Sequence, residues 1–185
     1  GSFKNEIMRE CADLFIDSKF VDKLDCDINL LGFDDGVYDT KSGIFRKGQP
    51  EDYITLSTKM NFNPNPSQES NDYVYKFLDE IFPQNDVREY MLTYMSSFVE
   101  GHLGNHYFHF CTGVGSNGKS VLWEFIQKAF GDYFCRMPIS LITQKRASSS
   151  QASPEVARAK GKRIVIFQEP EENSKLNMGL IKELS

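Results

Sequence analysis

Apolar side chains recur three or four residues apart, the spacing of a helix face, in four parts of this chain. The first part runs from Phe3 to Phe20. The other three carry their apolar residues at Tyr73, Phe77, Leu78 and Ile81, at Val87, Tyr90, Met91, Tyr94 and Phe98, and at Val121, Leu122, Phe125, Ile126 and Ala129. This period predicts four amphipathic helices, and we expect the aromatic stripes of the second and third to lie in the core.

Other stretches have the patterns of strands and turns. Residues 37–39 and 44–46 are short β-favouring runs separated by Thr40-Lys41-Ser42-Gly43, which predicts a small hairpin. Two longer apolar runs, 106–111 and 164–168, are typical of buried strands. Residues 61–67 contain two prolines between asparagines and are the best linker candidate.

A glycine-rich loop of the form G-x-x-x-x-G-K-[ST] lies between the 106–111 strand and the fourth helix. Its eight residues are expected to bind a nucleotide: Gly113, Val114, Gly115, Ser116, Asn117, Gly118, Lys119 and Ser120. Glycines allow the backbone N–H groups of such a loop to converge on phosphates. Lys119 would place a positive charge there, and the Ser120 hydroxyl would reach Mg²⁺. The loop therefore predicts a nucleoside triphosphate site at a helix N-terminus.

Carboxylates follow the second apolar strand, at Glu169, Glu171 and Glu172. An acidic group at the end of a buried parallel strand reaches the edge of the sheet where ligands bind. We assign Glu169 to the Mg²⁺ site and Glu171 to activation of the attacking water. The spacing alone does not separate Glu171 from Glu172, because Pro170 places a turn between them and the strand.

Composition narrows the class of protein. The chain has 185 residues, 40 % of them apolar, with no run long enough to span a membrane. Its four cysteines form no C-x-x-C pair, which favours buried, reduced thiols and an intracellular protein. His106 and His109 would point to opposite faces of a strand, so we expect no structural metal site there.

The net charge of −5 is unevenly divided along the chain. Residues 1–100 carry −9 and residues 101–185 carry +4. Basic residues surround a small-residue loop at 147–153, namely Lys145, Arg146, Arg158, Lys160, Lys162 and Arg163. These could meet phosphate or the nucleotide of a neighbouring subunit, or simply form a solvated surface.

These motifs together resemble those of the superfamily 3 helicases, and most closely the poxvirus-type primase-helicases of large DNA viruses. The likeness rests on the glycine loop, on Ser153-Pro154-Glu155-Val156-Ala157, on 159–165 and on Glu169-Pro170-Glu171, and it extends to 175–177 and 180–184. Upstream, 31–39 and 50–54 resemble the module that precedes the motor in that family. The resemblance therefore covers most of the chain from about residue 30 onward.

The resemblance implies an α/β fold with a P-loop, AAA+-like motor core, preceded by a mostly helical accessory module. We place the accessory module, with its small hairpin, at 1–100 and the N-terminal part of the P-loop ATPase/helicase domain at 101–185. A motor of this kind usually needs about 150–200 residues, so the core is expected to be incomplete at its C-terminus. Gly1-Ser2 would fit a cloning scar on a fragment.

The family implies an ATP-dependent DNA helicase that uses ATP and Mg²⁺, binds single-stranded and forked DNA, and assembles as a homo-oligomer, usually a hexamer. It also implies primase or other replication partners, no membrane association, and a location in the host cytoplasm or at viral replication sites. Two alternatives stay open. The chain could be a P-loop small-molecule kinase or another NTPase, although it has no N-K-x-D guanine motif; or it could be a non-enzymatic docking module for replication partners.

Overall fold

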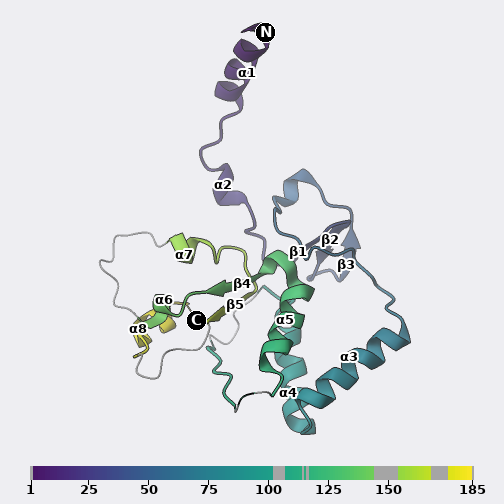
Figure 1. Ribbon diagram of the computed structural model, residues 1–185. Helices are drawn as coiled ribbons and strands as arrows, with labels where there is room; N and C mark the ends of the chain where they lie inside the picture. The colour runs from purple at the N-terminus through teal and green to yellow at the C-terminus, as the bar shows by residue number, and fades with distance from the viewer. Residues whose placement is uncertain are drawn as a thin grey trace.

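The computed structural model describes residues 2–101, 107–113, 115, 117–143, 154–167 and 175–184. Over these residues the protein is a mixture of helices and strands (Figure 1). The helices are α1 (Ser2–Phe15), α2 (Phe20–Lys23), α3 (Gln68–Ile81), α4 (Asn85–Ser96), α5 (Lys119–Phe130), α6 (Ser140–Thr143), α7 (Pro154–Ala157) and α8 (Met178–Leu184). The strands are β1 (Leu30–Phe33), β2 (Gly36–Asp39), β3 (Ile44–Arg46), β4 (Phe134–Met137) and β5 (Ile164–Phe167), and two 3₁₀ turns are η1 (Pro50–Asp52) and η2 (Gly131–Tyr133).

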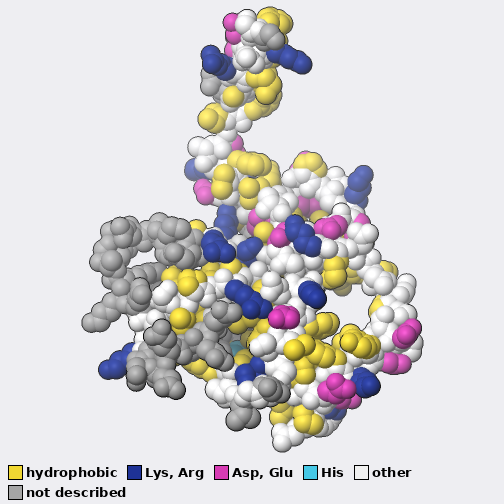
Figure 2. All heavy atoms as spheres, in the orientation of Figure 1, with side chains coloured by type: hydrophobic (Ala, Val, Ile, Leu, Met, Phe, Trp, Pro, Cys, Tyr) yellow, Lys and Arg dark blue, Asp and Glu magenta, His cyan; other side chains and the backbone are white. Residues whose placement is uncertain are grey.

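The first predicted helix is shorter than expected. α1 ends at Phe15, and α2 begins only at Phe20. α1 extends away from the rest of the molecule in Figure 1, and its apolar side chains, such as Phe3 and Leu14, are exposed. Figure 2 shows these apolar groups on the surface of α1 and α2. The amphipathic pattern therefore predicted the helix correctly. The apolar face of α1 is exposed, however, and is not packed in the core of the described residues.

The predicted hairpin is confirmed and forms part of a larger sheet. β2 and β3 pair antiparallel, with Val37 opposite Arg46 and Asp39 opposite Ile44. β1, which we did not predict, pairs antiparallel with β2 and forms one edge of this three-stranded sheet. Aromatic rings pack together beside the sheet, and Phe62 from the predicted linker stacks on Phe45 with ring centroids 4.4 Å apart.

α3 and α4 confirm the second and third predicted helices. The Ser67 side chain accepts a hydrogen bond from the Ser70 N–H at the start of α3, which satisfies one of the free donors of the first turn. The expectation for the aromatic stripes is only partly correct. Phe98 is buried and packs against Tyr94, but Tyr73 is 75 % exposed and Tyr90 58 % exposed.

The main core joins α3, α4, α5 and the second sheet. Its buried side chains are Leu78, Phe98, Leu122, Ile126, Phe134 and Ile164. The core therefore includes residues from both sides of the expected domain boundary at residue 100. The boundary itself stays a prediction, but α3 and α4 share their packing with the glycine-loop helix rather than with the N-terminal sheet.

β4 and β5 pair in parallel, with Phe134 opposite Ile164 and Met137 opposite Phe167. This confirms the strand predicted at 164–168 and shows that its partner is β4, which we did not predict. The strand predicted at 106–111 is wrong over its described part. Residues 107–110 form no strand, and Tyr107 and Phe110 are 67 % and 61 % exposed. Phe108 stacks on Phe167 at 5.9 Å, so this run contacts β5 by a ring and not by a hydrogen-bonded ladder.

The four cysteines are free, and their burial differs from the prediction. Cys135 is buried in β4, whereas Cys26 and Cys111 are exposed. Among the described residues, no helix combines the length and the apolar character needed to cross a membrane.

Candidate nucleotide site

The glycine loop leads directly into α5, as predicted. Gly118 is the N-cap of this helix and has a left-handed backbone, with φ +81°. Lys119 and Ser120 form the first turn, and the Leu122 N–H donates to the Gly118 carbonyl at 2.9 Å. The first N–H groups of a helix have no partner within the helix and attract anions. Val114 and Ser116 of the predicted loop lie outside the described residues.

Lys119 folds back across its own loop. Its ammonium nitrogen lies 2.8 Å from the Asn117 side-chain oxygen and 3.1 Å from the Gly113 carbonyl oxygen. These contacts hold the Lys119 ammonium against the loop, next to the start of α5. Gly113 has no room for a side chain, because a Cβ there would collide with the Asn117 amide. The described loop residues thus place the Lys119 ammonium between the Gly113 carbonyl and the Asn117 side chain.

Gly118 is also in close contact with α3. A Cβ at this position would lie 2.9 Å from Ile81 Cγ1, and its backbone conformation is one that L side chains rarely adopt. Gly115 differs, because a Cβ there would have no atom within 4 Å among the described residues outside its chain neighbours. Gly118 therefore packs the loop against α3, whereas Gly115 makes no such contact with the described residues.

The predicted acidic residues cannot be placed. Glu169, Glu171 and Glu172 lie outside the described residues, so their assignment stays a prediction. β5 ends just before them, at Phe167. The described part of the chain contains no group of three or more His, Cys, Asp or Glu side chains that could hold a metal ion. Ser120 is exposed at the start of α5.

The segment before the loop is held by α4. The His109 ring lies over Tyr94, with centroids 4.0 Å apart, and its Nε2 is 3.3 Å from the Tyr90 hydroxyl. Burial raises the pKa of Tyr94 to about 12, so this hydroxyl stays neutral in the physiological range. His102 and His106 lie outside the described residues. His109 thus has an aromatic environment that positions the start of the glycine loop.

Three of the basic residues that could meet phosphate or form a solvated surface contact backbone carbonyl groups of this chain, and two of these carbonyls lie in its N-terminal part. The Arg163 Nη2 donates to the Leu30 carbonyl at 3.0 Å, and Lys160 donates to the Val21 carbonyl at 2.9 Å. Lys162 donates to the Asp132 carbonyl at 2.6 Å. Arg158 is exposed, and Lys145 and Arg146 lie outside the described residues. Arg163 is thus bound to Leu30 within this chain, and contact of the basic residues with phosphate stays a prediction.

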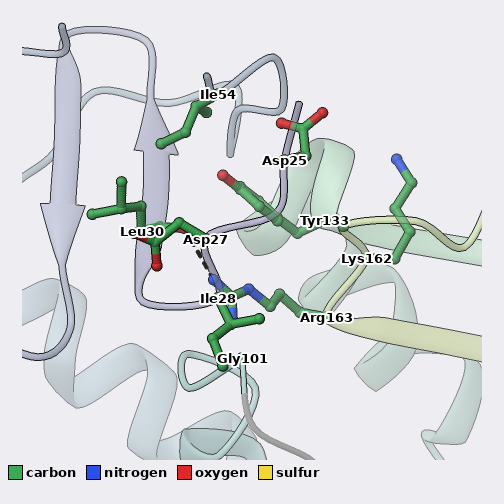
Figure 3. A pocket seen from close by; sticks show the side chains of 10 residues that line it. Asp25, Asp27, Ile28, Leu30, Ile54, Gly101, Tyr133, Lys162 and Arg163 are labelled. Atoms are coloured by element: carbon green, nitrogen blue, oxygen red, sulfur yellow. Dashed lines mark hydrogen bonds between the residues drawn. The ribbon is translucent and has the colours of Figure 1, made fainter. Parts of the chain in front are cut away.

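Figure 3 shows how Arg163 and Tyr133 meet the N-terminal sheet. The Arg163 guanidinium lies over the Tyr133 ring, 5.7 Å from its centroid, and both side chains border a cavity of about 50 Å³. Arg163 Nη1 is buried and has no hydrogen-bond partner among the residues that the structure describes, and burial lowers the pKa of this guanidinium. Sequence reasoning missed Tyr133, because a single tyrosine after Gly-Asp has no pattern that distinguishes it.

Comparison with known proteins adds a family to this geometry. Residues 1–83 match the family described as D5 N terminal like. A protein named "Putative helicase" in Acanthamoeba polyphaga mimivirus is 41 % identical over 98 % of this chain. The chain is similar over nearly its whole length to proteins of large DNA viruses that are named "Putative helicase" or "Putative primase". This confirms the family resemblance, and we refer to residues 1–83 as the D5 N-terminal-like region.

Two further relatives support the same relationship. A protein named "Putative helicase" in Invertebrate iridescent virus 6 is 29 % identical over 97 % of this chain, and one named "Putative primase" in African swine fever virus is 27 % identical over 99 %. The chain spans about a fifth of the length of these curated relatives, 19 % in each of the three. The D5 N-terminal-like region covers α1–α3 and the three-stranded sheet, and the match to the relatives continues through the glycine loop.

Proposed function

We propose that this chain contains the start of the ATP-dependent motor of a viral replicative primase-helicase, which couples ATP hydrolysis to duplex unwinding. The observation that carries the proposal is the placement of Lys119. Its ammonium lies over a glycine loop at the N-terminus of a 12-residue helix, with Asn117 and Gly113 as its partners. The names of the relatives supply the context of DNA replication.

Each residue of the loop has a role in this proposal. Lys119 exchanges its contacts with Asn117 and Gly113 for the γ-phosphate, and the backbone N–H groups from Gly113 to Gly118 surround the remaining phosphate oxygens. Ser120 and Glu169 are the candidate ligands of Mg²⁺, which would neutralise phosphate charge when bound with ATP. Glu171 is the candidate for orienting water, with Glu172 as its alternative.

The proposed DNA substrate, oligomeric state and partners of the whole protein rest on the family resemblance. We propose that the whole protein binds single-stranded and forked DNA and works as a ring, usually a hexamer, in which a neighbouring subunit completes each ATP site. On this basis the present chain alone would turn over ATP poorly, even if it binds ATP. Primase or other replication proteins are the proposed partners, and the proposed location is the host cytoplasm or a viral replication site.

The test of the site is calorimetric titration of the protein with ATP and with GTP, each with Mg²⁺. We expect ATP to bind and Lys119→Ala to abolish measurable binding, because the mutation removes the only charge described over the loop. The control is Lys128→Ala, in the last turn of the same helix, where the side chain is exposed. Equal ATP affinity in Lys119→Ala and the control would reject the site.

The two alternatives are separated by nucleotide binding together with ATP hydrolysis in the presence and absence of DNA. A small-molecule kinase or other NTPase would bind ATP, but DNA would not stimulate hydrolysis by the full-length protein. A non-enzymatic docking module would not bind nucleotide at all. Hydrolysis stimulated by single-stranded DNA would favour the helicase over both.

A further inference from the structure

The three-stranded sheet β1–β3 lies in the D5 N-terminal-like region, and we call it the D5 N-terminal-like sheet. Its edge strand β1 is covered by residues next to α5, β4 and β5, which we call the nucleotide-binding core after the function proposed above. β1 is at the edge of its sheet, with β2 on the other side. Backbone groups two residues apart on a strand face the same side, so the Leu30 carbonyl and the Gly32 N–H share one edge. Arg163 binds the first at 3.0 Å, and the Tyr133 hydroxyl accepts from the second at 2.7 Å. Edge groups of this kind would otherwise need water or another chain.

The Tyr133 hydroxyl both accepts and donates a hydrogen bond at this contact. It accepts from Gly32 and donates to the Leu56 carbonyl at 3.2 Å, and the side chain is only 3 % exposed. Removing Tyr133 would leave a buried N–H without a partner. The neighbouring segment closes the contact, because the Thr58 N–H donates to the Gly32 carbonyl at 3.0 Å and Thr58 is 2 % exposed.

A second group of bonds lies around Asp132. The Ser57 N–H donates to the Asp132 carboxylate at 3.1 Å, and Lys59 forms an ion pair with the same oxygen at 2.6 Å. The Asp132 N–H in turn donates to the Ser57 carbonyl at 2.9 Å. Gly131 lies so close to Thr58 that a Cβ would collide with its carbonyl. Hydrogen bonds, an ion pair and close packing thus all join residues 57–59 to Gly131 and Asp132 of η2.

Tyr133 and Arg163 each lie directly before a strand of the parallel sheet. η2 follows α5 directly and leads into β4, and Arg163 immediately precedes β5. The contact therefore holds the C-terminal end of the glycine-loop helix and the N-terminal ends of both parallel strands. The glycine loop lies at the other end of α5. The same helix that begins at Lys119 thus ends at the surface that covers β1.

We propose that the D5 N-terminal-like sheet and the nucleotide-binding core open and close as one cooperative unit, joined by Tyr133 and Arg163. Two packed regions that unfold together share one opening equilibrium, so a perturbation of either changes hydrogen exchange in both. If they were merely adjacent, each would open alone. The Gly32 amide reports on the sheet side and the Leu122 amide, bonded to Gly118, reports on the core.

The experiment is native-state hydrogen exchange at these two amides. Ile126→Val perturbs the core side, where Ile126 is 3 % exposed, and Val37→Ala perturbs the sheet, where Val37 is 5 % exposed. We expect Ile126→Val to speed exchange at Gly32 and Leu122 by the same factor, about 2- to 13-fold. Val37→Ala should also accelerate Leu122. Val121→Ala, on the exposed side of α5, is the control and should change neither amide.

Two results would overturn the proposal. One is acceleration of Leu122 by Ile126→Val with Gly32 unchanged. The other is acceleration of Gly32 by Val37→Ala with Leu122 unchanged. Tyr133→Phe separates the contact from general stability, and here the Thr40 amide, bonded to the Asn29 carbonyl at 2.8 Å, replaces Gly32 as the sheet reporter, because the mutation removes the acceptor of the Gly32 amide. In this background Ile126→Val should accelerate exchange less at Thr40 than at Leu122. An equal response of both amides in the Tyr133→Phe background would remove Tyr133 from the mechanism.

A final arm rests on the proposed function. ATP at 100 times its dissociation constant should slow exchange at both amides by about 100-fold, because the ligand stabilises the closed unit. Slowing at Leu122 alone would reject the coupling. No slowing at either amide would count against the nucleotide site and leave the coupling to be decided by the two mutational arms.

Discussion

At the scale of the residue, Gly118 and Lys119 connect the glycine loop to its surroundings: Gly118 lies against Ile81 of α3, and Lys119 contacts Asn117 and Gly113. The spacing of the motif was enough to locate both residues, whereas the nucleotide that the motif predicts stays a prediction. No pattern indicated that Ile81 packs against Gly118 or that Arg163 donates to the Leu30 carbonyl, since both contacts join residues far apart in the sequence. Long-range contacts of single side chains have no periodicity from which they can be inferred.

Gly118→Ala should destabilise the fold, and the matched change Gly115→Ala should not. The first puts a methyl group 2.9 Å from Ile81 at a left-handed backbone position, whereas the second puts it in open space. We expect a loss of about 1–3 kcal/mol in the free energy of unfolding for Gly118→Ala. Urea denaturation of both variants measures this, and equal stability of the two would show that the contact with α3 is unimportant.

Asp132 should make stability depend on pH in the acid range. Burial acts to raise the pKa of its carboxyl, but the hydrogen bonds from Lys59 and the Ser57 N–H outweigh burial, and the net pKa is lowered. A lowered pKa stabilises the folded state above the unfolded value, about 3.9, and this contribution is lost as the pH falls through the folded pKa. Denaturation between pH 6 and pH 2 should therefore show a decline that is smaller in Asp132→Asn. An identical profile in that variant would contradict the assignment.

At the scale of the element, periodicity succeeded where a helix carries its own signal. α3, α4 and α5 lie close to their predicted positions, and the β2–β3 hairpin has the predicted pairing. β1 and β4 were missed because neither LLGF nor FCRM alternates apolar and polar residues, and neither is a run of β-branched residues like the IVIF of β5. The run at 106–111 was predicted from its apolar content alone, and in the described residues 107–110 it contacts β5 through Phe108 without forming a ladder.

The two faces of α5 should respond differently to truncation. Ile126 is 3 % exposed in the core, whereas Val121 is 54 % exposed on the same helix. We expect Ile126→Ala to lower the free energy of unfolding by about 2–5 kcal/mol and Val121→Ala by less than about 0.5 kcal/mol. Thermal or urea unfolding of the two variants provides the comparison. Similar losses would mean that α5 does not pack through the face described above.

At the scale of the whole molecule, the sequence predicted the class of protein better than its internal boundaries. The α/β character and the relationship to viral helicases and primases follow from motifs that a reader can find in the chain. The packing of α3 and α4 into the core with α5 does not, because the proline-rich stretch at 61–67 suggests a linker there and composition changes near residue 100. Charge counted by halves likewise could not show that Arg163 of the basic half binds Leu30 of the acidic half.

The bond between Gly32 and Tyr133 also orders events during synthesis. These two residues are 101 positions apart in the chain. At translation rates of about 5–20 residues per second, the N-terminal sheet emerges about 5–20 s before Tyr133 exists. During that interval the Leu30 carbonyl and the Gly32 N–H of β1 lack their partners Arg163 and Tyr133, although the Gly32 carbonyl can already accept from the Thr58 N–H. A nascent chain would therefore carry a partly unpaired strand edge until the glycine-loop helix and the start of β5 have been made.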